Sequence, residues 1–130
     1  MPTAEDILMR KGSDVIACLP DTPVREAVHR MVEANVGCLL VEQDSKIIGI
    51  FTERDLLRRV VDECRNPDAT AVREVMASPV HFVSPDTDIL DCADMLARHQ
   101  FRHLMISDQG EPVGVLSLRD IAIELHSAGA

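Results

Sequence analysis

Two short stretches, "GIFTERD" at 49–55 and "GVLSLRD" at 114–120, repeat one pattern at an offset of 65 positions (114 − 49 = 65). Each has a glycine, two apolar residues, a hydroxyl residue, a variable residue, an arginine and an aspartate. At the same offset upstream, "PDT" at 20–22 recurs at 85–87. A repeat held at a constant offset predicts a tandem duplication of one structural unit.

The same order of elements can be read in both halves. After each "PDT", apolar residues recur at i, i+3, i+4 and i+7, which predicts an amphipathic helix. Two aliphatic runs separated by polar, turn-forming residues predict a β-hairpin, "CLLV" and "IIGIF" in the first half and "HLMI" and "PVGVL" in the second. A second helix closes each half, and a short extended segment precedes each "PDT". In the first half this second helix is expected over 53–64, with four side chains toward the core: Leu56, Leu57, Val60 and Val61.

The fold class that follows is α/β, with two tandem β-α-β-β-α repeats packed with pseudo-two-fold symmetry through their sheets. Residues 1–64 are assigned to the first repeat, 65–70 to a short polar linker and 71–130 to the second repeat. A half of about 60 residues buries little apolar surface by itself. We therefore expect the two repeats to form one module.

Charge and composition narrow the classes of partner. The formal net charge of −9 argues against nucleic acid and against an anionic membrane surface. No apolar run approaches the roughly 18 residues that span a bilayer, and the first residues lack the pattern of a secretory signal, so a cytoplasmic location is expected. His99 and His103 have the i, i+4 spacing of metal ligands, but the chain should pass from helix to strand between them, and no metal site is predicted.

Two interpretations compete for the hydroxyl and the carboxylate of each motif. Thr52 and Asp55, like Ser117 and Asp120, have the spacing of a capping box, in which both side chains satisfy free amides at a helix start. The alternative is a ligand site. An ionised aspartate offers two acceptor oxygens to adjacent sugar hydroxyls, and a hydroxyl beside free amides suits a phosphate. The sequence leaves both interpretations open.

The residues beside the motif favour the ligand interpretation. Gly49 and Gly114 each lie three positions before the hydroxyl residue, near the end of a predicted strand, where a missing side chain lets another group approach the backbone. Arg54 and Arg119 add a forked, permanently charged donor that suits a phosphate. Groups that suit a sugar and a charged phosphate would then all lie within one helical turn.

The arrangement resembles the cystathionine-β-synthase (CBS) domain, a family that occurs in tandem pairs called Bateman modules. The resemblance covers nearly the whole chain, from about Ile7 to Leu125. In that family the pattern of glycine, two apolar residues, Ser or Thr, two variable residues and Asp marks a nucleotide site. Here the pattern occurs twice, together with the repeat and the matching order of elements.

The resemblance implies a role for each motif residue. Asp55 and Asp120 would hold ribose hydroxyls, and Thr52 and Ser117 would contact ribose or phosphate. The base would lie in an aliphatic slot and be recognised largely by backbone groups. Four residues are expected near that slot: Ile16, Ala17, His81 and Phe82.

The two halves depart from the family pattern in different ways. The family often has a basic residue just before the middle strand and a Pro-Val within it. The second half has Arg102 and His103 at this position, whereas the first half has Gly37 and Cys38, and neither half has the proline. Because the basic residue typically serves phosphate, we expect one of the two clefts to prefer a more anionic ligand or to bind poorly.

By resemblance the chain is a stand-alone regulatory module that binds AMP, ADP or ATP in the clefts between its repeats, with NAD or S-adenosylmethionine as further candidate ligands. It would need no cofactor, would signal occupancy through a change of shape or of partner binding, as in energy sensing, and would associate as a disc-like homodimer. No Ser-His-Asp or Cys-His constellation and no phosphate loop is recognised in the sequence, so no enzyme is expected. The alternative function is an interaction module with degenerate clefts.

Overall fold

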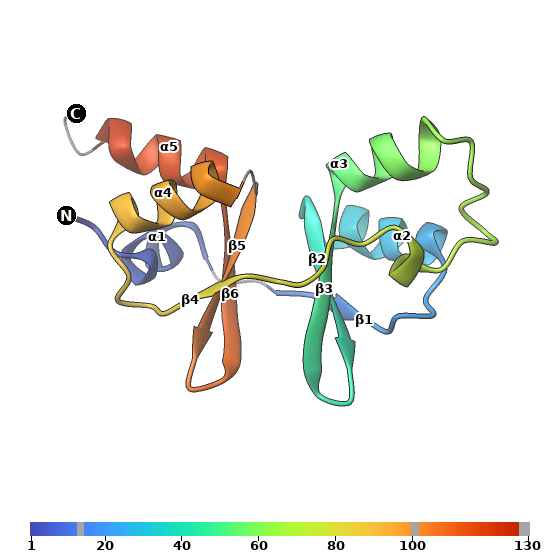
Figure 1. The fold of residues 1–130 in the computed structure, drawn as a ribbon, viewed down its shortest axis with the longest axis horizontal. Helices are drawn as coiled ribbons and strands as arrows, with labels where there is room; N and C mark the ends of the chain where they lie inside the picture. The colour runs from blue at the N-terminus through green and yellow to red at the C-terminus, as the bar shows by residue number, and fades with distance from the viewer. Residues whose placement is uncertain (13–14, 100–101, 128–130) are drawn as a thin grey trace. The chain divides into compact units, whose positions relative to one another are not determined.

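The computed structural model of the protein describes residues 1–12, 15–99 and 102–127 (Figure 1). The chain divides into two compact units. We call Ile16–Val80 the first unit, and Met1–Val15 together with His81–Ala130 the second unit. Each unit contains one copy of the repeated motif.

The first unit is built on a three-stranded sheet of order β1-β2-β3. Strand β1 runs parallel to β2, and β2 runs antiparallel to β3. Its elements are β1 (Ala17–Cys18), α2 (Val24–Ala34), β2 (Cys38–Gln43), β3 (Lys46–Thr52), α3 (Glu53–Asp55), the π-helix η1 (Leu56–Val61) and the 3₁₀-helix η2 (Val72–Glu74).

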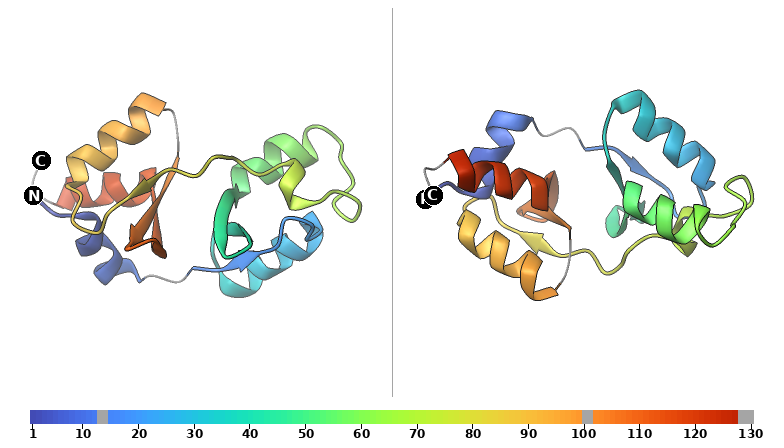
Figure 2. Two further views of the ribbon diagram at one scale, coloured as in Figure 1. Left: turned by 60° about the horizontal axis from the view of Figure 1, so that its bottom comes forward. Right: turned by 90° about the horizontal axis from the view of Figure 1, so that it is seen from above.

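The second unit repeats this plan with a sheet of order β4-β5-β6. Its elements are α1 (Ala4–Lys11), β4 (Phe82–Val83), α4 (Ile89–His99), β5 (His103–Asp108), β6 (Glu111–Ser117) and α5 (Leu118–Ser127). Helices α1, α4 and α5 gather around the sheet of this unit (Figure 2). The α/β class and the β-α-β-β-α order of each repeat are therefore confirmed.

The registers of the two hairpins match. Cys38 pairs with Thr52 in the first sheet, and His103 pairs with Ser117 in the second. A break in register follows Val41 in one hairpin and Ile106 in the other. The duplication seen in the sequence thus extends to the pairing of individual residues.

Each unit has its own cluster of buried apolar side chains. In the first unit the cluster includes Phe51 and Val60, and in the second it includes Leu116 and Ile121. The prediction for the helix after the first motif was only partly right, because Leu57 and Val61 are 63% and 62% exposed.

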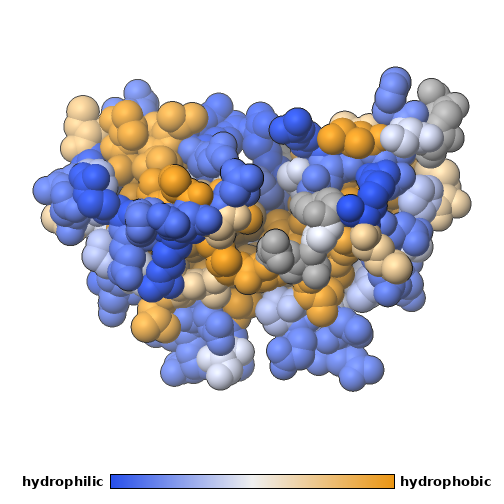
Figure 3. All heavy atoms as spheres, turned by 180° about the vertical axis from the view of Figure 1, so that it is seen from behind, coloured by the Kyte–Doolittle hydropathy of each residue, from blue (hydrophilic) through white to orange (hydrophobic). Residues whose placement is uncertain are grey.

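A change in helix type explains this exposure. Hydrogen bonds from Asp62 N to Leu57 O and from Arg65 N to Val60 O, both 2.9 Å, span five residues, as in a π-helix. The prediction assumed the residue spacing of an α-helix. A π-helical turn contains more residues, so that spacing does not apply here. Figure 3 shows one face of the molecule, on which apolar patches interrupt the hydrophilic surface.

The leading segment of each repeat packs in the unit that holds the rest of the other repeat. Helix α1 leads the first repeat but lies in the second unit, whereas η2 leads the second repeat but lies in the first unit. The boundaries predicted from the sequence follow the duplication along the chain, whereas the compact units follow contacts in space. Among the described residues, no helix is both long and apolar enough to cross a bilayer.

Candidate functional site

The first motif lies where β3 ends and α3 begins. Thr52 is the N-cap of α3, and its hydroxyl oxygen accepts a hydrogen bond from the Asp55 amide at 3.2 Å. In return, the Thr52 amide and hydroxyl donate to Asp55 Oδ2 at 3.0 and 3.1 Å. The capping box predicted from the spacing is therefore present, and both residues are buried.

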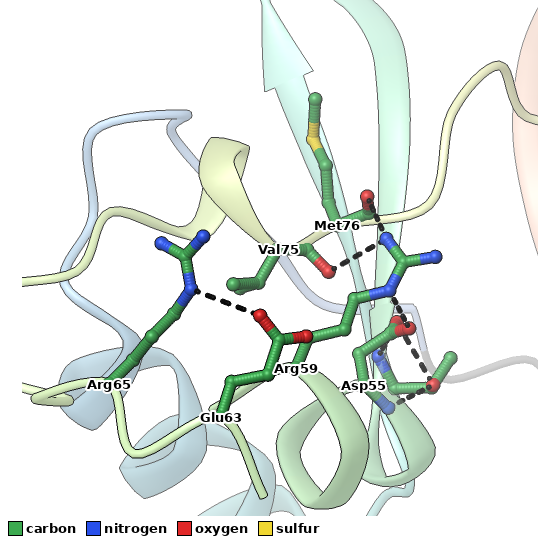
Figure 4. Close-up of polar contacts among 7 residues, drawn as sticks. Asp55, Arg59, Glu63, Arg65, Val75 and Met76 are labelled. Atoms are coloured by element: carbon green, nitrogen blue, oxygen red, sulfur yellow. Dashed lines mark hydrogen bonds and ion pairs between the residues drawn. The ribbon is translucent and has the colours of Figure 1, made fainter. Parts of the chain in front are cut away.

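The other oxygen of Asp55 faces an arginine one turn along the helix. Arg59 Nε lies 3.7 Å from Asp55 Oδ1 (Figure 4). The same guanidinium donates through Nη1 to the carbonyl oxygens of Met76 and Val75, at 3.0 and 3.4 Å. Arg59 thus connects the motif carboxylate to the segment that follows η2.

Burial is the main influence on the charge of Asp55. It raises the pKa of this carboxyl above its ordinary value of 3.8, while the hydrogen bonds from Thr52 and the positive charge of Arg59 act in the opposite direction. These contacts favour the ionised form, which is the form that can only accept hydrogen bonds.

The second motif repeats the capping geometry at the start of α5. The Ser117 amide donates to Asp120 Oδ2 at 2.8 Å, and the Asp120 amide donates to Ser117 Oγ at 3.0 Å. Both residues are half-buried, so this copy is more open than the first.

Capping uses only part of the acceptor capacity of Asp55. An ionised aspartate has about four acceptor positions. In the described contacts of Asp55, one oxygen serves the cap and the other lies near Arg59. The capping role and a contact with sugar hydroxyls are therefore compatible.

Pairing between strands brings the start of each middle strand to its own motif. The Glu53 amide donates to Gly37 O at 3.0 Å in the first unit, and the Leu118 amide donates to Arg102 O at 2.8 Å in the second. The sequence alone left open which motif lies near Arg102. Within the second unit, this residue lies directly beside the Ser117–Asp120 motif.

The residues expected around the base divide between the units. Ile16 and Ala17 line a shallow pocket of about 560 Å³ in the first unit, together with Arg30 and other residues of α2. His81 O accepts a hydrogen bond from the Met105 amide at 3.0 Å, and Phe82 in β4 is 44% exposed. Each unit therefore contains two of the four residues expected around the base.

The motif glycines make room for the protein's own chain. A Cβ at Gly49 would lie 2.4 Å from Met76 Sδ, and a Cβ at Gly114 would lie 2.5 Å from Leu8 Cδ2. The sequence predicted that another group approaches the backbone here. In the structure, the group at each glycine is a side chain from the leading segment of the other repeat.

The predicted residues are thus brought together in two sets. The first unit holds Ile16, Ala17, Gly37, Cys38, Thr52, Arg54 and Asp55, and the second holds His81, Phe82, Arg102, His103, Ser117, Arg119 and Asp120. Arg54 is half-buried and Arg119 is exposed. Among the described residues, no three His, Cys, Asp or Glu side chains form a group that could hold a metal ion.

Sequence reasoning missed three charged side chains beside the predicted site residues of the first unit. Arg59 was detectable, because it lies four residues after Asp55 on the same helix. Arg30 donates to Ala17 O at 3.1 Å, and Glu53 lies over Gly37. The last two contacts join residues from different elements, so local spacing gives no sign of them.

Comparison with known proteins agrees with this geometry. The family model described as "CBS domain" matches residues 4–62 and 72–127. The CBS domain-containing protein YhcV of Bacillus subtilis is 32% identical over 115 residues, which are 88% of this chain and 81% of that protein. Across several curated relatives, the chain spans 56% to 81% of the relative's own length.

Solved structures show the same fold. A protein with CBS domains from Burkholderia ambifaria has a TM-score of 0.88 at 32% identity, covering 98% of this chain and 96% of that one. A hexameric CBS-CP12 protein from bloom-forming cyanobacteria has a TM-score of 0.85 at 26% identity, covering 94% of this chain and 67% of that one. Two matches to the family model, a relative of similar length and a shared fold have one explanation: this chain belongs to the CBS-domain family and carries two copies of the domain.

Proposed function

We propose that this protein is a regulatory module that binds an adenine nucleotide at its CBS motifs and converts occupancy into a change of shape or of partner affinity. One observation carries the proposal. In both units a hydroxyl, a carboxylate and the entry to the middle strand meet at the start of a helix. This is the set of groups that a ribose phosphate requires.

Each group has a part in this proposal. Asp55 and Asp120 accept hydrogen bonds from ribose hydroxyls, and Thr52 and Ser117 contact ribose or phosphate. The pocket lined by Ile16 and Ala17 has a volume of about 560 Å³, which is enough to hold part of a planar base. The expected ligands are AMP, ADP or ATP, with NAD and S-adenosylmethionine as alternatives that share the adenosine group.

A regulatory role fits the family better than catalysis does. In the described contacts, the motif hydroxyls and carboxylates cap helices. We propose that the module works in the cytoplasm, reports cellular energy state and associates with itself as a homodimer. The hexameric cyanobacterial protein is a related case of self-association. An interaction module with degenerate clefts is the competing function.

The test is a ligand screen by thermal shift. A ligand that binds only the folded state stabilises it by about 2.7 kcal/mol at a hundredfold excess over its Kd. For a chain of this size we expect the melting temperature to rise by roughly 4 °C or more with at least one of AMP, ADP, ATP, NAD and S-adenosylmethionine. The double variant Asp55→Asn, Asp120→Asn should lose most of this rise, because Asn keeps an acceptor for the cap but carries no charge.

The chain offers a matched control for the loss of a capping carboxylate. Thr3 and Asp6 form a further capping box at α1, with hydrogen bonds of 2.8 and 3.3 Å, and neither residue belongs to a motif. Asp6→Asn should lower the melting temperature slightly and leave the ligand-induced rise unchanged. If no ligand stabilises the wild type, the module binds none of these nucleotides and the degenerate-cleft function is favoured.

A further inference from the structure

We propose that Glu53 makes the first motif select against phosphorylated ligands, which leaves the second motif as the site for the more anionic nucleotide. This inference rests on the proposed function, because it assigns ligands of different charge to the two motifs. It goes further in naming one side chain as the determinant.

The geometry places the Glu53 carboxylate at the entry of the middle strand. Glu53 is the first residue of α3, and its amide donates to Gly37 O at 3.0 Å. A Cβ at Gly37 would lie 3.0 Å from Glu53 Oε1. The acidic side chain therefore lies over the glycine, immediately beside Thr52 and Asp55. Any larger residue at position 37 would have to displace it.

The second unit has the opposite charge at the matching place. Leu118 occupies the position of Glu53, and its amide donates to Arg102 O at 2.8 Å, so the backbone contact is the same. Leu118 is 44% exposed and uncharged, and the exposed Arg102 stands where the first unit has Gly37. The pair Glu53 and Gly37 in the first unit thus corresponds to Leu118 and Arg102 in the second.

Electrostatics turns this difference into ligand choice. The phosphate of AMP carries a charge of about −1.5 to −2 at neutral pH. A ribose held by Asp55 keeps its 5′-phosphate within a few ångströms of the motif, where the exposed carboxylate of Glu53 repels it. The arginines of the two motifs, Arg54 and Arg119, are common to both units and do not discriminate between them.

The experiment compares AMP with adenosine, which has the same base and ribose but no phosphate. Each motif is studied alone, in an Asp120→Asn background for the first and an Asp55→Asn background for the second. In the first background, Glu53→Leu should raise the affinity for AMP relative to adenosine by about three- to ten-fold, as measured by calorimetric titration. In the second background, the reciprocal change Leu118→Glu should lower the same ratio by a similar factor.

Two controls separate a local charge effect from other causes. Glu63→Leu removes another exposed carboxylate of the first unit and should leave the ratio unchanged. The effect of Glu53→Leu should also shrink as salt is raised from low to high concentration, which a steric effect would not do.

Each outcome has a distinct meaning. If adenosine and AMP bind but Glu53→Leu leaves their ratio unchanged, or if Glu63→Leu changes it equally, Glu53 is not the determinant while the proposed function stands. If the wild type binds neither ligand, the inference is overturned, and the proposed function is overturned only if ADP, ATP, NAD and S-adenosylmethionine also fail in the thermal-shift screen.

Discussion

Asp55 has a structural role that any ligand must share. Its Oδ2 closes the cap of α3, and its Oδ1 faces Arg59, which also holds the carbonyls of Val75 and Met76. The spacing of Thr52 and Asp55 was sufficient to predict the cap, since a capping box is a local pattern. The same spacing at Thr3 and Asp6, outside both motifs, gives the same capping box. At this scale, the sequence predicts local hydrogen bonds well and contacts between elements poorly.

Arg59→Gln tests how Asp55 is kept ionised. Removing the cation should raise the pKa of Asp55 further above 3.8. Below about pH 3.8 the carboxyl is protonated in the folded and unfolded chains, so the ion pair contributes nothing there. As the pH rises through the folded pKa, the carboxylate ionises and the variant lacks its counter-charge. The stability lost through the substitution should therefore grow toward neutral pH, by up to about 1 kcal/mol.

Urea denaturation at a series of pH values measures this difference, and carboxyl NMR titration measures the pKa itself. Arg58→Gln is the matched control, because Arg58 is the exposed neighbour on the same helix. An equal loss of stability at every pH would mean that Arg59 acts only through the two carbonyls.

At the scale of elements, the glycines of the motif are positions of close packing. The sequence predicted a close approach at Gly49 and Gly114. It could not identify Met76 and Leu8 as the neighbours, because these residues come from segments distant along the chain. The helix after the first motif shows a similar limit. Its apolar spacing predicted a regular α-helix. The π-helical turns that expose Leu57 could not be recognised from that spacing.

Gly49→Ala should destabilise the protein more than Gly114→Ala. The new methyl group at Gly49 would meet Met76 at 2.4 Å and also the backbone oxygen of Ala77 at 3.1 Å. That oxygen accepts a hydrogen bond from Ile50 at 3.0 Å and cannot move without weakening it. At Gly114 the three nearest atoms all belong to the side chain of Leu8, and none of them is a backbone atom.

We expect a loss of about 1–3 kcal/mol for Gly49→Ala and a smaller loss for Gly114→Ala, from the midpoints of urea unfolding. Adding Met76→Ala to Gly49→Ala should recover only part of the loss, because the clash with the carbonyl remains. Full recovery would show that the side chain alone is responsible, and equal losses at the two glycines would contradict the difference in packing.

At the scale of the whole molecule, the chain exchanges its leading segments between repeats. Helix α1 is held in the second unit by backbone hydrogen bonds from Ala4 to Thr87 O at 2.9 Å and from Ile89 to Pro2 O at 3.0 Å. The duplication, the fold class and the order of elements could all be predicted, because the sequence shows them as apolar periodicity and as a repeat at a constant offset. The exchange could not, since it depends on which sheet each leading segment meets and no local pattern encodes that choice.

Ile7→Ala tests the exchange. Ile7 lies in α1, is fully buried and belongs to the apolar cluster of the second unit. Its truncation should cost about 2–5 kcal/mol, and the cost should fall mainly on the second unit. Hydrogen exchange should therefore lose protection in β5, β6 and α4 well before β2 and β3, although Ile7 belongs to the first repeat in the sequence. Met9→Ala, on the same helix but at a side chain that is 80% exposed, should change little. Loss of protection confined to β2 and β3 would contradict the placement of α1, and a uniform loss would show that the two units open as one cooperative body.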